Sequence, residues 1–225
     1  MTSRSLPQTD NDWHAFLAGF ENVVLVANAP GVDPDVVSTL FPGKTLFCFF
    51  NRTFKVLTKP FERDSLVFCA LHRDRPSILK RKEMPQVEAC FGSEALKGIA
   101  AVSIYPDIRA NMDGFGNVPN TLLDLVDLAG VADYPGETPT TGFLITRWML
   151  GLGLENVHVY GFNGQRSDRW RVYAGHNWTL EQIGLRTLAN RGDIKMHAAD
   201  GSEAGPNIHA ALEHMFPDIP PSELH

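Results

Sequence analysis

Cysteine is scarce in this sequence, and the cysteines it has are far apart. The chain of 225 residues contains three, Cys48, Cys69 and Cys90. An odd number at this spacing fits neither a disulfide framework nor a C-x-x-C zinc or redox motif. We therefore expect a chain that works in a reducing compartment.

Long apolar runs are also lacking. No stretch approaches the roughly 20 apolar residues that a membrane-spanning helix needs. Residues 1–8 do not have the apolar centre of a signal peptide. These two absences predict a soluble protein of the cytoplasm.

Positive charge is in deficit, because the formal net charge at pH 7 is -6. A nucleic-acid-binding protein needs a surplus of lysine and arginine on one face to neutralise phosphates, so nucleic acid is not an expected partner. One basic cluster interrupts this trend: Arg73, Arg75, Lys80, Arg81 and Lys82. We interpret the cluster as a solvated face, and the alternative is a peripheral contact with the anionic inner face of a membrane.

The glycine-rich dinucleotide fingerprint is absent as well. The first apolar run ends in Ala27-Asn28-Ala29-Pro30-Gly31, which does not contain G-x-G-x-x-G. A nicotinamide-dependent oxidoreductase is therefore a weak hypothesis.

Short apolar runs are abundant, and they alternate with helical patterns. Runs of the kind that is buried on both faces of a parallel sheet occupy residues 23–27, 45–50, 66–71, 99–105, 157–162 and 194–198. Amphipathic or capped helices are expected between and around them, at residues 10–20, 34–41, 121–129, 143–150, 179–190 and 207–216. This alternation predicts an α/β fold, a Rossmann-like open and mostly parallel sheet with helices on both faces. With 44% hydrophobic residues, the whole chain 1–225 is expected to form a single domain, with a loose N-terminus at residues 1–9.

One stretch carries a pattern suited to binding an anion. Thr138-Pro139-Thr140-Thr141-Gly142 is a polar turn that leads into an apolar helix and then a buried strand. The first backbone N–H groups of a helix have no partner within the helix, and its dipole favours negative charge there. A phosphate could bind to Thr140, Thr141 and the amide of Gly142. The structural alternative is that the threonines only cap the helix.

A second polar entry to a helix follows at His176-Asn177-Trp178-Thr179-Leu180-Glu181. Thr179 to Gln182 has the spacing of a capping box, which predicts that the helix begins at Thr179 and leaves His176 in the preceding loop. His176 is a candidate general base. Residues 163–175 are polar and rich in arginine, and we interpret them as a flexible flap beside the site.

Polar residues also follow the predicted strands. Asn28 and Asn51 stand just past the first and second strands, and His72 past the third. Ligands of open α/β sheets bind beyond the carboxyl ends of the strands. The asparagines are therefore candidate ligand contacts, with termination of the strand as the alternative, and His72 is interpreted as structural.

These motifs resemble those of the sialyltransferases. Pro139-Thr140-Thr141-Gly142, with its helix and the strand 157–162, resembles the small sialylmotif of the animal enzymes, and His176-x-x-x-x-Glu181 is similar to their very small motif. The bacterial lipooligosaccharide sialyltransferases are of similar size, and their first strand ends in Gly-Asn-Gly-Pro-Ser where this chain has Ala27 to Gly31. The resemblance covers scattered blocks between about residues 23 and 198.

The resemblance implies an inverting glycosyltransferase of polysaccharide biosynthesis that uses a CMP-activated acidic sugar, with no catalytic metal and no cofactor beyond the CMP-sugar co-substrate. His176 would be the general base and Glu181 a residue that orients the loop or His176. Donor-binding residues would be Asn28, Asn51, Thr140, Thr141, Gly142 and Tyr173. The partners would be the sugar-nucleotide donor and a glycan or glycolipid acceptor.

Two further points stay open at this stage. A nucleotide-binding or sugar-nucleotide-binding protein of the same fold without transferase activity is the main alternative. The sequence does not determine whether the sugar is sialic acid or a related keto-acid sugar, nor the acceptor, nor the oligomeric state.

Overall fold

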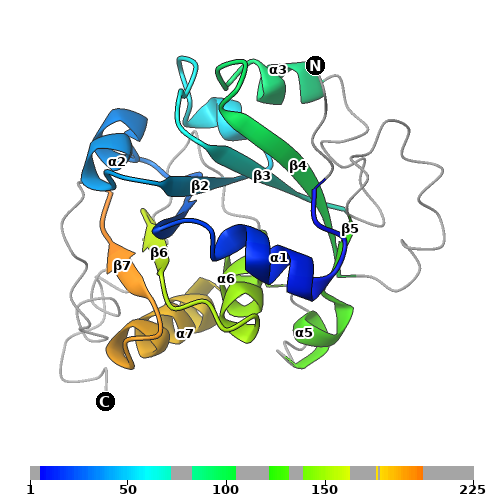
Figure 1. Ribbon diagram of the computed structural model, residues 1–225. Coiled ribbons are helices and arrows are strands. Elements are labelled where there is room, and N and C mark those ends of the chain that lie inside the picture. The colour runs from blue at the N-terminus through cyan, green and yellow to red at the C-terminus, as the bar shows by residue number, and fades with distance from the viewer. Residues whose placement is uncertain are drawn as a thin grey trace, which may run out of the picture.

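The fold is a layered α/β structure around one parallel sheet. The computed structural model describes residues 6–71, 83–104, 122–131, 139–162, 176 and 178–199. Within these residues seven strands pair in the order β5-β4-β3-β2-β1-β6-β7, and every pairing is parallel (Figure 1). The predicted Rossmann-like architecture is confirmed.

The strands are β1 (Asn22–Val26), β2 (Thr45–Phe50), β3 (Ser65–Ala70), β4 (Leu96–Ser103), β5 (Leu122–Asp124), β6 (Val157–Tyr160) and β7 (Lys195–His197). The helices are α1 (Asp10–Leu17), α2 (Pro34–Leu40), the 3₁₀ turn η1 (Thr53–Lys55), α3 (Met84–Glu88), α5 (Val126–Val131), α6 (Thr141–Gly151) and α7 (Trp178–Asn190). In this described part of the chain no helix is both long enough and apolar enough to cross a membrane.

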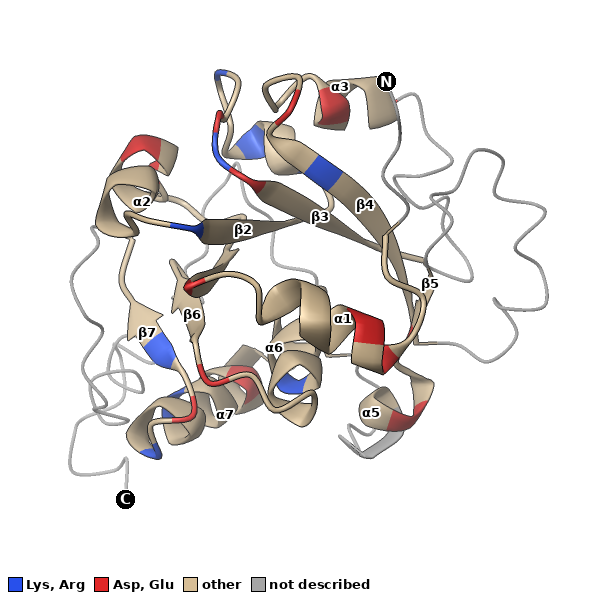
Figure 2. Cartoon of the chain, viewed as in Figure 1, with Lys and Arg blue, Asp and Glu red and all other residues tan. Residues whose placement is uncertain are grey.

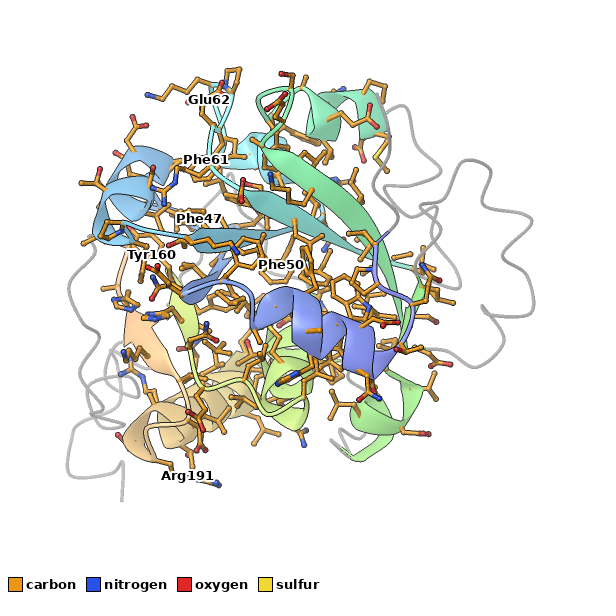
Figure 3. All side chains as sticks on the ribbon, in the orientation of Figure 1. Phe47, Phe50, Phe61, Glu62, Tyr160 and Arg191 are labelled. Carbon is orange, nitrogen blue, oxygen red and sulfur yellow. The ribbon has the colours of Figure 1, made fainter. Side chains whose placement is uncertain are left out.

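Residues on alternate sides of the strands build two apolar cores, because successive strand side chains point to opposite faces. On one face Phe50 and other β-strand residues pack against α1, α5, α6 and α7. On the other face Phe47 and Phe61 pack with α2, η1 and α3. Figure 3 shows the labelled Phe47 and Phe61 away from α1 and Phe50 toward it. Helices therefore cover both faces of the sheet.

Helix starts follow the expected cap chemistry. The Asp33 side chain accepts a hydrogen bond from the Asp35 amide at 2.9 Å, and Pro34 occupies the first turn of α2. Thr9 accepts from the Asp12 amide at 3.2 Å and so caps α1. Leu6 is buried and packs where a Cβ on Gly98 of β4 would lie. Leu6 thus packs on the sheet, whereas the loose terminus expected for 1–9 stays a prediction, and residues 1–5 are outside the described residues.

One predicted element needs correction. Residues 121–129 were expected to form one helix, whereas Leu122–Asp124 forms the edge strand β5 and α5 begins only at Val126. Leu123 and Leu125 are buried against the sheet, and this pairing with β4 outweighs the helical spacing. The expected helix at 207–216 lies outside the described residues.

The order of strands fixes where a ligand crevice should lie. From β1 the chain proceeds through β2, β3 and β4 to β5, then returns to the other side of β1 as β6 and β7. Strand order reverses between β1 and β6, and in open α/β sheets ligands bind at such a switch point, beyond the carboxyl ends of the strands. Both α6, which precedes β6, and α7, which follows it, have their N-termini at this rim.

Acidic and basic residues are interspersed over the helices and strand ends of the described chain (Figure 2). A protein that binds nucleic acid by charge concentrates its basic residues on one face. The absence of a nucleic-acid partner stays a prediction from the net charge.

Candidate functional site

Asn28 follows β1 at the switch point, as predicted. Its side-chain Nδ2 donates to the backbone carbonyl of Phe50 at the end of β2. Its Oδ1 is buried and has no hydrogen-bond partner among the residues that the structure describes. Because a buried acceptor without a donor is costly, this oxygen is the part of Asn28 available to a ligand.

Asn51 follows β2 in a backbone conformation that is uncommon for a residue other than glycine, with φ of 47°. Its Oδ1 accepts a hydrogen bond from the Ala70 amide at 2.8 Å, so it joins the end of β2 to the end of β3. Asparagine adopts this conformation more readily than most residues. The structural role of Asn51 is therefore visible, and its proposed ligand role stays a prediction.

Phe162 connects the end of β6 to both helix starts. Its ring lies edge-on to Phe50, with centroids 6.1 Å apart, and a Cβ on Gly142 would lie 2.5 Å from its Cε1. Its carbonyl accepts a hydrogen bond from Nε2 of Gln182 at 3.0 Å. Gly142 thus permits close approach of α6 to Phe162, two residues past the end of β6.

A carboxylate joins the N-termini of α6 and α7. Both the backbone N–H and the hydroxyl of Thr140 donate to Glu181, one to each carboxylate oxygen and each at 2.6 Å. The same hydroxyl oxygen accepts from the Phe143 amide at 3.2 Å, which makes Thr140 the N-cap of α6. Short bonds from both donors to one carboxylate are a strong, charge-assisted contact.

This carboxylate is deeply buried, since Glu181 is 3% exposed. Burial raises its pKa to about 7, and the two hydrogen bonds from Thr140 lower the pKa by less than burial raises it. Glu181 therefore exchanges a proton near neutral pH.

The observed role of Thr140 consequently differs from the phosphate-binding role predicted from the sequence. Its two donors are already used by Glu181, and the phosphate role predicted for Thr141 and the Gly142 amide stays a prediction. The capping-box prediction at Thr179 is wrong, because α7 begins at Trp178 and Gln182 bonds to Phe162 instead.

His176 lies two residues before α7. Its ring is half-buried and packs edge-on against Trp178, with centroids 5.5 Å apart and planes at 86°. Since Glu181 in the first turn of α7 binds the N-cap of α6, the His176 loop and the Thr140–Gly142 turn lie at the same rim of the sheet. Tyr173, the flap 163–175 and His72 lie outside the described residues.

Comparison with protein-family models, with curated proteins and with solved structures found no match. The likeness of the motifs to sialyltransferases remains a resemblance of short sequence blocks.

Two histidines whose contact the sequence did not reveal lie on β6 and on the edge strand β7. His158 of β6 and His197 of β7 stack with their ring centroids 5.3 Å apart, and His158 Nδ1 is 3.0 Å from His197 Nε2. Phe41 packs edge-on to both rings. Burial, then the charges of His197 and Lys195, lower the pKa of His158 to about 4. Both positions face the same side of adjacent strands, which only the strand order discloses.

Metal ligands do not cluster in the described chain. Among these residues no group of three or more histidine, cysteine, aspartate or glutamate side chains is close enough to hold a metal ion. The three cysteines are buried and unpaired, and burial raises the pKa of each thiol. The expectation of metal-free chemistry stays a prediction.

Gly161, directly after β6, allows Val32 of the loop after β1 to pack closely against it. Its φ is +73°, and a Cβ there would overlap Cγ2 of Val32. Replacement by alanine should lower the free energy of unfolding by about 2 kcal/mol or more, because the left-handed conformation alone costs about 1–2 kcal/mol. Denaturant unfolding measures the loss.

Gly153 provides the matched control for that change. Its φ is +84° and nothing lies within 4 Å of an added Cβ, so Gly153→Ala should show the conformational cost alone. A second change, Val32→Ala, should recover part of the loss in Gly161→Ala. Equal losses at the two glycines would contradict the proposed contact with Val32.

Proposed function

We propose that this protein is an inverting glycosyltransferase that moves an acidic sugar from a CMP donor to a glycan hydroxyl. The acidic sugar is sialic acid or a related keto-acid sugar, His176 is the general base, and no catalytic metal takes part. One observation carries the proposal: the Thr140–Glu181 contact, which holds the start of α6 next to the start of α7 at the switch point.

The chemistry of the transfer needs two groups at one site. A base must take the proton of the acceptor hydroxyl, and histidine is suited to this near neutral pH. Donors must stabilise the negative charge that grows on the departing CMP phosphate. In the proposal the imidazole of His176 fills the first role, and Thr141 with the Gly142 amide fills the second.

The asparagines complete the proposed donor site. The unpaired Oδ1 of Asn28 would accept a hydrogen bond from an N–H or O–H of the nucleotide or sugar. Asn51 lies at the end of the next strand, and Tyr173 would contact the phosphate. A glycan or glycolipid acceptor would approach His176 from the other side of the sugar, as inversion requires.

The rival proposal is a nucleotide-binding or sugar-nucleotide-binding protein without turnover. Ala27 and Ala29 flank Asn28, and Asn28 and Asn51 each make a hydrogen bond that holds the strand ends together. These features suit a sheet that binds a nucleotide without catalysis. Release of CMP from a CMP-sugar distinguishes the two proposals, since only the enzyme produces it.

A panel of nucleotides tests the shared part of both proposals. CMP, UMP, GMP and CDP would each be added to the full chain, and the melting temperature recorded. A ligand that binds only the folded state raises the melting temperature. A shift selective for CMP supports the proposal, and a shift with UMP or GMP but not with CMP contradicts it. CMP-linked sialic acid and Kdo would then be offered as donors, and CMP release measured.

Thr141 gives a local test of phosphate binding. Thr141→Val removes the hydroxyl and keeps the shape of the side chain, so affinity for CMP should fall by about 1–3 kcal/mol, as expected for one lost hydrogen bond to a charged group. Calorimetric titration measures the change. Thr187→Val, an exposed site farther along α7, is the matched control and should leave the affinity unaltered. Unaltered affinity in Thr141→Val would remove this hydroxyl from the site.

A further inference from the structure

Glu181 places a negative charge at the helix start to which the proposed function assigns a phosphate. Both of its oxygens accept hydrogen bonds from Thr140, the cap of α6. The adjoining donors, Thr141 and the amide of Gly142, belong to the first turn of the same helix. A bound phosphate would therefore lie beside a carboxylate that is 3% exposed.

Two anions in so buried a place raise each other's pKa. Burial already raises the pKa of Glu181 to about 7, and the hydrogen bonds from Thr140 offset only part of this increase. A second negative charge within roughly 4–6 Å disfavours the ionised form further. The carboxylate can relieve the repulsion by taking a proton from solvent.

Other charged groups on the packed elements must be considered as well. Arg147 lies farther along α6, with its guanidinium 6.0 Å from the centre of the Phe143 ring. Arg186 lies farther along α7, and burial lowers its pKa. His176 precedes α7 and is a further titratable group at this rim. A test of proton exchange at Glu181 must therefore separate it from His176.

We propose that Glu181 takes up a proton when a nucleotide phosphate binds at the start of α6, so that nucleotide binding and protonation of this carboxylate are linked. The proposal rests on the proposed function, because it needs a phosphate at this helix. The proton comes from water or buffer and ends on a carboxyl oxygen of Glu181. No other bond forms or breaks.

The linkage has a defined sign. Above pH 7 the free protein carries an ionised Glu181, and binding has to bring a proton. The dissociation constant for CMP should therefore rise with pH above about 7, by up to about tenfold per pH unit. Below pH 6 Glu181 is already protonated, and this contribution to the pH dependence disappears.

Calorimetry of CMP binding at pH 8 measures the proton directly. CMP carries two charges at this pH, because its second phosphate pKa is near 6. Titrations in Tris and in HEPES, which have different ionisation enthalpies, give the number of protons taken up per CMP. The wild type should take up close to one proton, whereas Glu181→Gln should take up none and bind CMP more tightly at pH 8.

Two control variants identify the group. His176→Ala should retain the uptake if Glu181 is its source. Glu155→Gln changes an exposed glutamate in the turn before β6 and should also retain it. If Glu181→Gln does not fold by circular dichroism, Thr140→Ala replaces it: loss of the hydroxyl raises the pKa of Glu181 further, so uptake at pH 8 should decrease.

The outcomes separate the inference from the function. If CMP binds the wild type and Glu181→Gln with the same proton uptake, or if His176→Ala abolishes the uptake, the linkage is overturned while the proposed function stands. If CMP does not bind the wild type at any pH from 6 to 8, the proposed function and the linkage fall together. Uptake that is present in the wild type and lost only with Glu181 supports the linkage.

Discussion

His176→Ala should lower the rate of transfer from a CMP-sugar by a factor of about 100 to 10,000, the usual contribution of a positioned general base. The affinity for CMP should change little, because in the proposed function the imidazole acts on the acceptor hydroxyl and not on the nucleotide. Initial rates of CMP release at saturating donor measure the first quantity, and calorimetric titration measures the second.

Two controls distinguish the loss of a general base from a disruption of the structure around His176. His14, an exposed histidine on α1, supplies a matched variant, and His14→Ala should retain the full rate. Imidazole added to His176→Ala should restore part of the rate, which a collapsed loop would not permit. A variant that retains the wild-type rate would exclude His176 as the base and favour a different acceptor-binding group.

Two buried groups should oppose each other in the pH dependence of stability. The pKa of His158 is lowered from 6.5 to about 4, so the unfolded chain binds this proton more readily than the folded one. Its contribution to stability is present above pH 6.5 and is lost as the pH falls toward 4, in total about 3 kcal/mol. His158 is 6% exposed, so solvent screens this effect little.

Glu181 has the opposite sign. Its pKa is raised from 4.5 to about 7, so the folded chain binds this proton more readily than the unfolded one. Its contribution is present below pH 4.5 and is lost as the pH rises through 7, again by about 3 kcal/mol. Between pH 4.5 and 6.5 the two effects should largely cancel.

A pair of single variants should reveal each slope. Glu181→Gln should make the free energy of unfolding rise between pH 4.5 and 6.5 by about 2–3 kcal/mol relative to the wild type, because the effect of His158 is no longer cancelled. His158→Leu should make it fall by a similar amount over the same range. Urea unfolding at closely spaced pH values measures both.

The double variant tests whether the effects of Glu181 and His158 on stability are additive. Glu181→Gln with His158→Leu should return the pH dependence toward that of the wild type, since the two sites are independent and their effects add. If a single variant keeps the wild-type slope, the pKa of the group that it replaces is not perturbed as the structure indicates. Such a result for Glu181 would also weaken the proton linkage with the nucleotide.

Much of the fold was predictable from local chemistry. The apolar runs at residues 23–27 and 45–50 are rich in β-branched and aromatic residues, and they become the buried strands β1 and β2. The positions of Asn28 and Asn51 past these strands were also predictable, since the chain must turn where the apolar run ends.

The failures share a cause. Residues 122–124 have a weak local preference, and pairing with β4 decides that they form a strand. Thr179 and Gln182 have the spacing of a cap, but the Gln182 side chain donates instead to the carbonyl of Phe162, a residue that is distant in sequence. Contacts between distant segments overruled the local pattern in both cases.

By itself the sequence determined the class of fold, the burial of the strands and the polar turns that begin α6 and α7, because these depend on periodicity and on capping chemistry within a few residues. Tertiary structure alone decided that Glu181 occupies the donors of Thr140 and that His158 stacks on His197. These partners are about 40 residues apart along the chain, and only the order of the strands and the crossing of the helices brings them together. Burial then sets their pKa values, and burial is a property of the packed molecule.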